Sequence, residues 1–450
     1  MKTKEVVSII LEAEKKSNVF NLKHKKKYLV WPFYRMYFFY EYLNQKTDTG
    51  ELGFKASKIN ISRFKDFLIL LSNSKLHRLF YRQNKDNLII STQRYVGENE
   101  IYTKDLKDLS GDNFLDISFS NRFIFRDGPI YLDFIKIVLK LISRVSHYFF
   151  NAPNEVKHFF SIVDADKSCE IQYKRYRIEY SLWFYIYDIL IKIQKPKRIF
   201  LTDGIYLSPL IAVAEKYNIE VIEMQHGVIN KYHLAFHFPD QKRNTYFPHK
   251  LLMFSDYWKS KATYPQGTEL ISTGNDFLFY DFDKDKENKT ILIIGNGLLY
   301  NQFLSFLKLN INFFEKNGYK ITYKLHPAEI PGWETRYKEL KELNDSKRIE
   351  VITDESSIAI LIKKSEFVIG VNSTSIYESL DAGCKVIILD LQSAEYFDDL
   401  IKSNIVKKKN PLIPISTIDF DFTQTHKQTI RFFDPSNKEL IKTILKTLKP

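Results

Sequence analysis

Polar residues follow several apolar runs of this sequence, at positions where the strands of a buried parallel sheet would end. The clearest case is a hydroxyl-rich turn made of Asn372, Ser373, Thr374 and Ser375. It follows the apolar run 367–370 and opens a short helical segment that stops at Gly383. A helix that begins there offers free N–H groups, hydroxyls and the positive end of its dipole, which together suit a phosphate. Glu378, one turn further on, is placed to reach a ribose hydroxyl, although an ordinary capped helix explains the same pattern.

Four further polar turns end predicted strands. They are Thr202-Asp203-Gly204 and Gln225-His226-Gly227 in the first half, and Gly295-Asn296-Gly297 and His326-Pro327 in the second. Each alone has a plain structural explanation: a helix cap for Asp203, a satisfied histidine for His326, and tight turns for the glycines. Ligands of open parallel sheets bind outside the carboxyl ends of the strands. Five such turns on the same predicted edges therefore indicate a binding site.

The elements that would position these turns alternate between strand and helix from Lys195 onward. In the first half we expect strands at 198–201, 219–224, 251–254 and 270–271, with helices at 207–217 and near Trp258. A charged segment, 280–289, reads as an interdomain linker. After it we expect strands at 290–294, 320–325, 348–352, 367–370 and 386–389, and helices at 299–316 and 358–363. The fold class predicted is α/β: two doubly wound, Rossmann-like domains that face each other across a cleft.

The domain boundaries follow from this alternation. Residues 1–280 form the first, acceptor-side domain with a helical, aromatic N-terminal region, and residues 289–430 form the second domain. Residues 431–450 contain a helix, 438–448, that is expected to cross back to the first domain. Residues 130–150 and 172–193 read as helices, whereas the short apolar runs 67–71 and 88–90 indicate strands.

The N-terminal region, 1–45, reads as helical and contains a basic run, 23–27, beside the aromatic segment 28–40. Cations next to a dense aromatic helix fit an anionic membrane face, and a buried helix with a solvated basic turn fits equally well. Arg35, among the aromatic residues, is either a structural ion-pair partner or a contact to an anionic ligand.

The composition limits the class of protein. The 450 residues carry a net charge of +13, with 44% hydrophobic and 27% charged residues, which is typical of a globular protein that favours anionic partners. Two cysteines give neither a disulfide framework nor metal-ligand spacing, so no metal is expected. The sequence shows no signal peptide, no run long enough to cross a bilayer and no nucleic-acid-binding motif. It predicts a cytoplasmic protein, with peripheral contact to the inner face of the cell membrane and no nucleic-acid partner.

These residues also carry a family resemblance. The second half resembles the nucleotide-binding domain of GT-B glycosyltransferases, in which a Glu, here Glu378, holds the ribose and a Gly, here Gly383, closes the helix. Three motifs resemble those of bacterial sialyltransferases and polysialyltransferases: Asp203-Gly204, His326-Pro327 and Ser373-Thr374-Ser375. Gln225-His226-Gly227 resembles a turn of bacterial Kdo-type and capsule glycosyltransferases. The resemblance covers mainly residues 195–395, and it departs at Thr202, where those sialyltransferases carry a second acid.

The resemblance implies an inverting, metal-independent glycosyltransferase of surface-polysaccharide (capsule or lipopolysaccharide) synthesis. It would move a CMP-activated acidic sugar, such as sialic acid or Kdo, from the nucleotide to a glycan acceptor, with no cofactor besides this donor. Asp203 would be the base and His326 would act on the phosphate. The donor would also contact Gly295, Asn296, Gly297, Pro327, Asn372, Ser373, Thr374, Ser375 and Glu378, while Gln225, His226 and Gly227 would contact donor or acceptor.

Other functions stay open at this point. Within the enzymes, the alternatives are a UDP- or GDP-sugar glycosyltransferase, a polyol-phosphate transferase and a sugar-nucleotide 2-epimerase-like enzyme. The basic, aromatic N-terminal region favours a transferase, because an epimerase needs no acceptor surface. Outside the enzymes, a carbohydrate-binding or nucleic-acid-binding protein is compatible with the net charge.

Overall fold

The computed structural model describes residues 1–46, 64–91, 95–96, 99–119, 125–243, 245–278, 286–326, 329–353, 358–422 and 430–447. The chain forms two compact units. Unit 1 comprises Met1–Thr3, Thr47–Lys58 and Asn275–Pro435, and unit 2 comprises Lys4–Lys46, Ile59–Gly274 and Ser436–Pro450. The chain passes between the units after Gly274, which is earlier than the charged segment 280–289, and again after Pro435.

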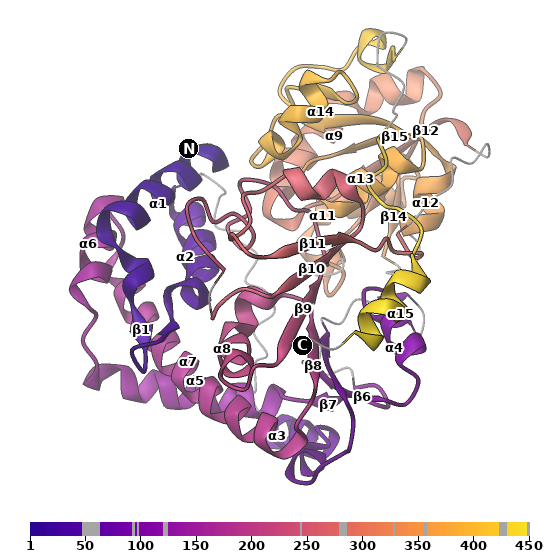
Figure 1. The fold of residues 1–450 in the computed structure, drawn as a ribbon. Helices are drawn as coiled ribbons and strands as arrows, with labels where there is room; N and C mark the ends of the chain where they lie inside the picture. The colour runs from indigo at the N-terminus through magenta and orange to yellow at the C-terminus, as the bar shows by residue number, and fades with distance from the viewer. Residues whose placement is uncertain are drawn as a thin grey trace. The chain divides into compact units, whose positions relative to one another are not determined.

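Unit 2 is built on a parallel sheet of seven strands in the order β11-β10-β9-β8-β3-β6-β7 (Figure 1). The strands are β3 (Asn87–Ser91), β6 (Phe114–Ser118), β7 (Ile130–Tyr131), β8 (Arg198–Leu201), β9 (Glu220–Met224), β10 (Lys250–Met253) and β11 (Glu269–Ser272). Around it lie α1 (Thr3–Ser17), α2 (Trp31–Lys46), α3 (Phe64–Asn73), α4 (Lys104–Ser110), α5 (Asp133–Ser146), α6 (Asn154–Val163), α7 (Lys167–Gln194), α8 (Ser208–Lys216) and α15 (Lys438–Lys446). Small hairpins pair β1 (Lys23–His24) with β2 (Tyr28–Leu29), and β4 (Tyr95–Val96) with β5 (Asn99–Glu100).

Both faces of this sheet are covered, because successive strand residues point to opposite sides. One face carries Leu88, Ile90, Ile199 and Leu201, which pack with residues of α5, α7 and α8. The other face carries Ile89, Phe200 and Ile222, which pack with Leu106 of α4 and with Ile441 and Ile444 of α15. Strands buried on two faces read as continuous apolar runs, which is why the sequence shows them.

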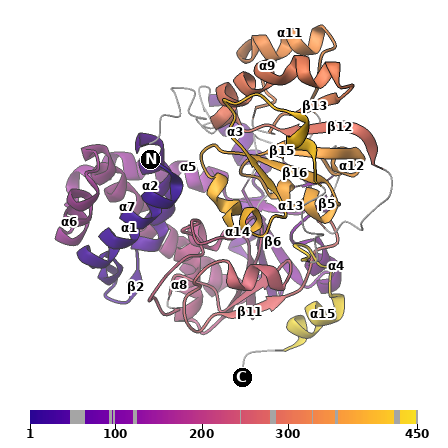
Figure 2. The same cartoon turned by 90° about the horizontal axis from the view of Figure 1, so that it is seen from above.

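Unit 1 holds a second parallel sheet, of six strands in the order β14-β13-β12-β15-β16-β17. The strands are β12 (Glu287–Ile294), β13 (Lys320–Lys324), β14 (Glu350–Ile352), β15 (Ser365–Gly370), β16 (Lys385–Leu389) and β17 (Lys407–Lys409). The helices are α9 (Tyr300–Lys316), α10 (Trp333–Arg336), α11 (Lys338–Asp345), α12 (Ile358–Lys364), α13 (Thr374–Asp381) and α14 (Asp398–Lys402). Helix α11 lies beside α9 (Figure 2), where Lys308 pairs with Glu339.

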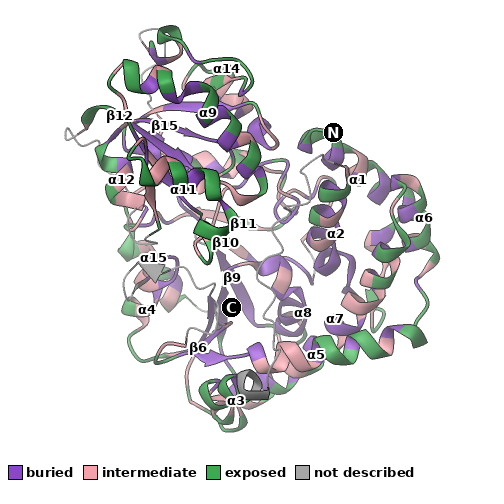
Figure 3. Ribbon diagram, turned by 180° about the vertical axis from the view of Figure 1, so that it is seen from behind, coloured by how far each residue is buried: buried purple, intermediate pink, exposed green. Residues whose placement is uncertain are grey.

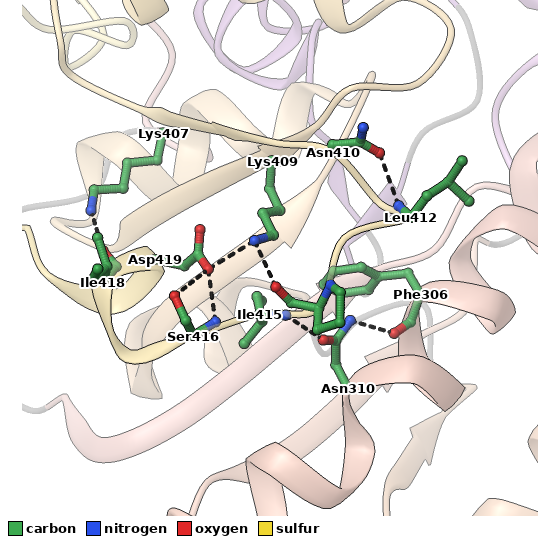
Figure 4. A network of polar contacts seen from close by, with 11 residues as sticks. Phe306, Asn310, Lys407, Lys409, Asn410, Leu412, Ile415, Ser416, Ile418 and Asp419 are labelled. Carbon is green, nitrogen blue, oxygen red and sulfur yellow. Dashed lines mark hydrogen bonds and ion pairs between the residues drawn. The ribbon is translucent and has the colours of Figure 1, made fainter.

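The edge strand β17 is held by the loop that follows it. Lys409 Nζ contacts Pro414 O and Asp419 Oδ2, each at 2.9 Å (Figure 4). Asn310 of α9 accepts a hydrogen bond from the Ile415 N–H at 2.6 Å and so fixes the same loop. Covering an edge in this way removes a template for unwanted pairing with another chain.

The structure confirms the α/β class with two doubly wound, Rossmann-like sheets, and it corrects several local predictions. Residues 67–71 lie in α3 instead of a strand, because Leu70 alone of the described residues there is buried, as on one face of a helix. The element at Trp258 is a short 3₁₀ helix, η5 (Asp256–Ser260). The first strand of the parallel sheet is β3, so the parallel fold begins well before Lys195.

The predicted linker 280–289 is only partly described. Residues 280–285 lie outside the described residues, and 287–289 belong to β12.

Of the two interpretations of residues 23–40, the structure supports the buried helix with a solvated basic turn. Helix α2 is largely buried, with Trp31, Tyr34, Phe38 and Phe39 all at most 1% exposed. The aromatic rings that suggested a lipid contact instead form the contact of α2 with α6 and α7, as in the pair Trp31–Phe159. Over the part of the chain that the structure describes, no helix is both long and apolar enough to span a bilayer.

Candidate functional site

Three of the five predicted turns follow strands at the topological switch points of the two sheets. In unit 2 the first strand, β3, has β6 on one side and β8 on the other, so the strand order reverses between β3 and β8. Asp203 follows β8. In unit 1 the order reverses between β12 and β15, which end just before Gly295 and Asn372. Ligands of doubly wound sheets bind at such points, outside the carboxyl ends of the strands. The two units thus place their candidate residues in the same relation to their sheets.

The centre of the unit 2 site is an ion pair between Asp203 and His226. Asp203 Oδ1 lies 2.7 Å from His226 Nε2, and the Asp203 N–H approaches His226 Nδ1 at 3.4 Å. Burial acts to raise the pKa of Asp203, but the charge and hydrogen bond of His226 outweigh it and leave this pKa below its usual value. Burial likewise acts to lower the pKa of His226, and Asp203 reverses the direction. Asp203 is therefore a carboxylate, and its Oδ1 holds the His226 ring in place.

The geometry of the pair leaves Asp203 able to react. Both ring nitrogens of His226 are engaged by Asp203, whereas Asp203 Oδ2 makes no hydrogen bond to any described residue. The Asp203 side chain keeps 33% of its surface exposed. Its backbone has φ 57° and ψ 44°, a left-handed conformation that Asp and Asn tolerate better than other residues with a side chain. The pair thus places an accessible carboxylate oxygen at the carboxyl end of β8, with His226 fixing its orientation.

Glu223, in strand β9, fixes the Asp203-Gly204 turn through a hydrogen bond. Its Oε1 accepts a hydrogen bond from the Gly204 N–H at 3.0 Å. A Cβ at position 204 would lie 2.3 Å from Glu223 Oε2, so this turn requires glycine. Glu223 is 2% exposed, and burial, only partly opposed by the charge of His226, raises its pKa to about 7. Sequence analysis overlooked Glu223, although a lone acid inside the apolar run 221–224 was a visible signal.

This pKa predicts a pH-dependent stability. Between pH 4.5 and about 7 the folded state binds more protons at Glu223 than the unfolded state does, so the contribution of this carboxyl to stability falls as the pH rises through that window. The Glu223→Gln variant keeps an oxygen for the Gly204 N–H and does not ionise. Relative to the wild type, it should gain about 3 kcal/mol of unfolding free energy between pH 4.5 and pH 8. Urea unfolding at several pH values measures this difference, and a pH-independent difference would contradict the assignment.

Gln225 and Gly227 shape the second turn. Gln225 is 1% exposed; its Nε2 donates to Gly227 O at 2.8 Å and its Oε1 accepts from the Phe254 N–H at 3.0 Å. These bonds tie the turn to the end of β10. Gln225 therefore has a structural role. The expected ligand contact of His226 in this turn stays a prediction. A Cβ on Gly227 would meet nothing within 4 Å.

Other residues around Asp203 were not found from the sequence. Burial, then the charge of His226, lowers the pKa of His233 to about 4, so His233 is a neutral imidazole whose Nδ1 is buried without a hydrogen bond to any described residue. Tyr37 and Tyr206 lie with ring centroids 5.0 Å apart. Burial is the largest cause of the raised pKa of Tyr37, Tyr40 and Tyr206, and the charge of Asp203 adds to it in all three. These phenol groups therefore stay neutral beside the carboxylate.

The buried Arg35 is a structural residue and settles the alternative left open by the sequence. Its Nε and Nη2 donate to the two carboxylate oxygens of Glu14 at 2.6 and 2.8 Å. Its Nη1 donates to Leu234 O at 2.6 Å and to His237 O at 2.8 Å. Trp31 Nε1 adds a third hydrogen bond to Glu14, at 2.7 Å. Helices α1 and α2 therefore hold the loop after β9, which carries His226 and His233.

In unit 1 the hydroxyl turn opens helix α13 as predicted. Ser373 is the N-cap, and its Oγ accepts a hydrogen bond from the Ser375 N–H at 3.2 Å. Ser373 and Thr374 are half-buried and Asn372 is exposed, whereas Ser375 is buried. The helix ends at Asp381, and Gly383 in the turn that follows has a φ of 75°, the left-handed conformation usual after a helix. This arrangement is compatible with a phosphate at Ser373 and Thr374, and it is also a complete structural cap.

Glu378, in α13, is buried, with 1% of its surface exposed. The predicted contact to a ribose stays a prediction, because this carboxylate would have to become accessible first. Gly370, at the end of β15, explains the close approach of α13. A Cβ there would lie 2.7 Å from Ile376 Cδ1.

The turns after β12 and β13 are also well built. A Cβ on Gly295 would lie 2.9 Å from both Lys324 O and Tyr323 Cε1, so this glycine is needed for packing. Asn296 Oδ1 accepts from the Leu298 N–H at 3.1 Å and begins the 3₁₀ helix η6 (Gly297–Leu299).

His326 is exposed at the end of β13, and its turn is held by a buried acid. The His326 N–H donates to Glu329 Oε2 at 2.9 Å, and His326 O accepts from the Glu329 N–H at 2.7 Å. Pro327 lies outside the described residues. Asp203 and His326 belong to different units, so the expectation that they face each other stays a prediction. Among the described residues, no group of three or more His, Cys, Asp or Glu side chains is arranged to hold a metal ion.

Comparison with known proteins gives distant similarities. No family model matches the chain. A relative from Methanocaldococcus jannaschii, the uncharacterized protein MJ1060, is 28% identical over 241 residues, which is 50% of this chain. The chain spans 42% of the length of that relative.

Two solved structures share the arrangement of elements at low sequence identity. A UDP-GlcNAc 2-epimerase of the same archaeon, in complex with UDP-GlcNAc and UDP, has 10% identity and a TM-score of 0.47, over 80% of this chain and 98% of that chain. MurG of Acinetobacter baumannii has 11% identity and a TM-score of 0.45, over 80% of this chain and 100% of that chain. At this level neither structure carries an argument about the activity of this chain.

Proposed function

We propose that this protein is a metal-independent glycosyltransferase that moves a sugar from a nucleotide donor to a glycan acceptor. The observation that carries the proposal is the Asp203–His226 pair, an ionised and partly exposed carboxylate at the switch point of the unit 2 sheet. Glycosyl transfer requires a base for the acceptor hydroxyl and a group that stabilises the departing phosphate. The switch point of the unit 1 sheet supplies the second requirement, since Ser373 and Thr374 lie at a helix N-terminus.

In this mechanism an acceptor hydroxyl binds at Asp203 Oδ2 and gives up its proton as its oxygen attacks the anomeric carbon. His226 keeps Asp203 oriented throughout. The bond from the anomeric carbon to the donor phosphate breaks, and the negative charge left on that phosphate is stabilised by the N–H groups and hydroxyls at the start of α13, with His326 as a further donor. A single displacement of this kind inverts the anomeric configuration.

For the donor we propose a CMP-activated acidic sugar. The support for this choice is the resemblance of Asp203-Gly204, His326-Pro327 and Ser373-Thr374-Ser375 to sialyltransferase motifs, together with the net charge of +13. Thermal-shift measurements with CMP, UDP and GDP test the nucleotide. Incubation of the preferred nucleotide sugar in D₂O, with and without glycan acceptors, then tests the reaction. Transfer to an acceptor supports the proposal, whereas deuterium exchange at C2 without an acceptor would indicate an epimerase.

The phosphate site makes a separate prediction. The Ser373→Ala/Thr374→Ala double variant should weaken nucleotide binding by about 1–3 kcal/mol, because hydrogen bonds to a charged group are lost. Calorimetric titration of the folded variant at low temperature measures this loss. Ser416 provides a matched control. It is also a serine N-cap in unit 1, at the start of the 3₁₀ helix η9 (Thr417–Phe420), which follows β17. Equal affinity of the double variant and the Ser416→Ala control would exclude α13 as the phosphate site.

A further inference from the structure

Helix α5 and the 3₁₀ helix η3 (His147–Phe149) present a row of large apolar side chains to solvent. We call this row the α5–η3 stripe; its members are Leu141, Ile142, Val145, Tyr148, Phe149 and Phe150. Their exposed fractions run from 41% for Ile142 to 84% for Phe149. In Figure 3 the exposed colour marks the C-terminal half of α5. Six neighbouring side chains of this size form a continuous surface instead of isolated exposed residues.

The stripe is the outer face of an amphipathic helix. Leu141, Val145 and Tyr148 follow one another at helical spacing, so they share one side of the helix. The opposite side carries Leu139, Ser143 and His147, all buried. There Ser143 Oγ donates to Glu179 Oε1 of α7 at 2.9 Å. A helix on the surface of a soluble domain normally turns its apolar side inward, and α5 does the reverse over its last two turns.

Helix α3 contacts α5 and also has exposed apolar residues. Its Leu68, Ile69 and Leu71 are exposed by 37–47%. Several large apolar side chains exposed together mark an interaction surface more often than scattered ones do.

The charges beside the stripe are positive. Lys140 and Arg144 are both exposed and alternate with its apolar members along α5. Glu179 of α7 lies against this part of α5 and is buried. Asp133, at the start of α5, is buried as well. A partner that binds this surface must therefore offer apolar groups to the stripe and negative charges to Lys140 and Arg144.

We propose that the α5–η3 stripe docks the protein on an anionic lipid bilayer. An amphipathic helix with aromatic and aliphatic side chains on one side and cations at its border lies in the interface of such a bilayer. Tyr148 suits the level of the headgroups, where amphipathic rings collect. Lys140 and Arg144 reach the anionic headgroups, and each such cation strengthens the binding. This surface differs from the one expected from residues 28–40 and is independent of the Asp203 site and of the proposed activity.

A second copy of the chain fits the surface less well. In a two-fold dimer the same patch meets itself, so Lys140 and Arg144 of both copies would be brought together. Like charges within an interface oppose association. Anionic headgroups neutralise the same charges, and the structure therefore favours lipid over self-association.

Co-sedimentation of the full chain with vesicles tests the proposal, with phosphatidylcholine alone compared with phosphatidylcholine containing phosphatidylglycerol. The wild type should bind the anionic vesicles and bind the neutral ones weakly. Val145→Glu/Phe149→Glu should lower the partition constant by about tenfold or more, because charges replace inserted apolar groups. Lys140→Gln/Arg144→Gln should lower binding to the anionic vesicles by about 30-fold, at roughly fivefold for each neutralised cation, and should leave binding to neutral vesicles unchanged.

Leu412 and Ile418 provide the matched control, since they are 79% and 76% exposed in unit 1. Leu412→Glu/Ile418→Glu should bind vesicles like the wild type. Circular dichroism and light scattering on each variant establish folding and oligomeric state. A wild type that stays in the supernatant with anionic vesicles overturns the proposal, as does equal loss in the control variant. A dimer that Val145→Glu/Phe149→Glu converts to a monomer would assign the stripe to self-association instead.

Discussion

Replacing Asp203 with asparagine should reduce sugar transfer by about 10²–10⁴-fold, the usual contribution of a general base. The amide nitrogen and oxygen cannot accept the proton of the acceptor hydroxyl. The variant should still fold, because asparagine tolerates the left-handed backbone at this position as well as aspartate does. Nucleotide affinity should stay at the wild-type level, since the proposed phosphate site belongs to unit 1. Initial rates and calorimetric nucleotide titrations, made on the same preparation, measure the two effects separately.

Asp164 offers a control for this experiment. It also has a left-handed backbone, at the end of α6, and its side chain is fully exposed. Asp164→Asn should transfer sugar at the wild-type rate. Wild-type turnover by Asp203→Asn would remove Asp203 from the mechanism and leave a nucleotide-binding α/β protein without an assigned base.

The second large effect concerns stability. Glu14→Ala would leave the Arg35 guanidinium buried beside only carbonyl oxygens, and it would also leave Trp31 Nε1 without its acceptor. Removing one partner of a buried, hydrogen-bonded ion pair costs about 3–5 kcal/mol. Because Arg35 also holds the carbonyls of Leu234 and His237, the loss should loosen the loop that carries His226. Urea unfolding should show the lower midpoint, and hydrogen exchange should show faster exchange in 226–238.

Glu12, on the same helix, tests whether the burial of the pair matters. It pairs with Lys16 at 2.6 Å, but both side chains are more than half exposed. Glu12→Ala should unfold at the wild-type midpoint, because exposed pairs add little. The Glu14→Leu/Arg35→Met double variant should be more stable than Glu14→Ala, since it buries no unpaired charge. If Glu14→Ala and Glu12→Ala unfold at the same midpoint, the pair does not stabilise unit 2.

The sequence predicts the two sheets well where strands are buried on both faces, as in β15 or β16, because those strands are apolar runs. It misses the edge strands β7 and β17 and the surface helix α3. Strand β17 consists of Lys407, Lys408 and Lys409, which no hydrophobic pattern marks as a strand; it is held by the loop contacts of Lys409. The segment 67–71 has the composition of a strand, and as α3 it keeps several of its apolar residues exposed.

In the candidate site, too, some residues could be predicted from the sequence and others could not. Asp203, His226 and Ser373 were predictable because polar residues that interrupt a βα alternation fall at strand ends. The residues around Asp203 were not, since Tyr37, His233 and Arg35 reach it or its loop from distant segments of unit 2. Only the fold brings α2 and the loop after β9 together. The role of Gln225 was also beyond the sequence, because its partners are backbone atoms of Gly227 and Phe254.

The last helix of the chain, α15, has a consequence for synthesis. Its Ile441 and Ile444 complete the apolar layer under Ile89, Phe200 and Ile222, and Arg198 Nη1 donates to Ile444 O at 2.6 Å. Unit 2 otherwise ends at Gly274, so a ribosome must translate the whole of unit 1 before the layer can close. The nascent chain therefore carries an incompletely covered apolar sheet face while residues 275–435 are made, and a premature stop near residue 436 would damage unit 2.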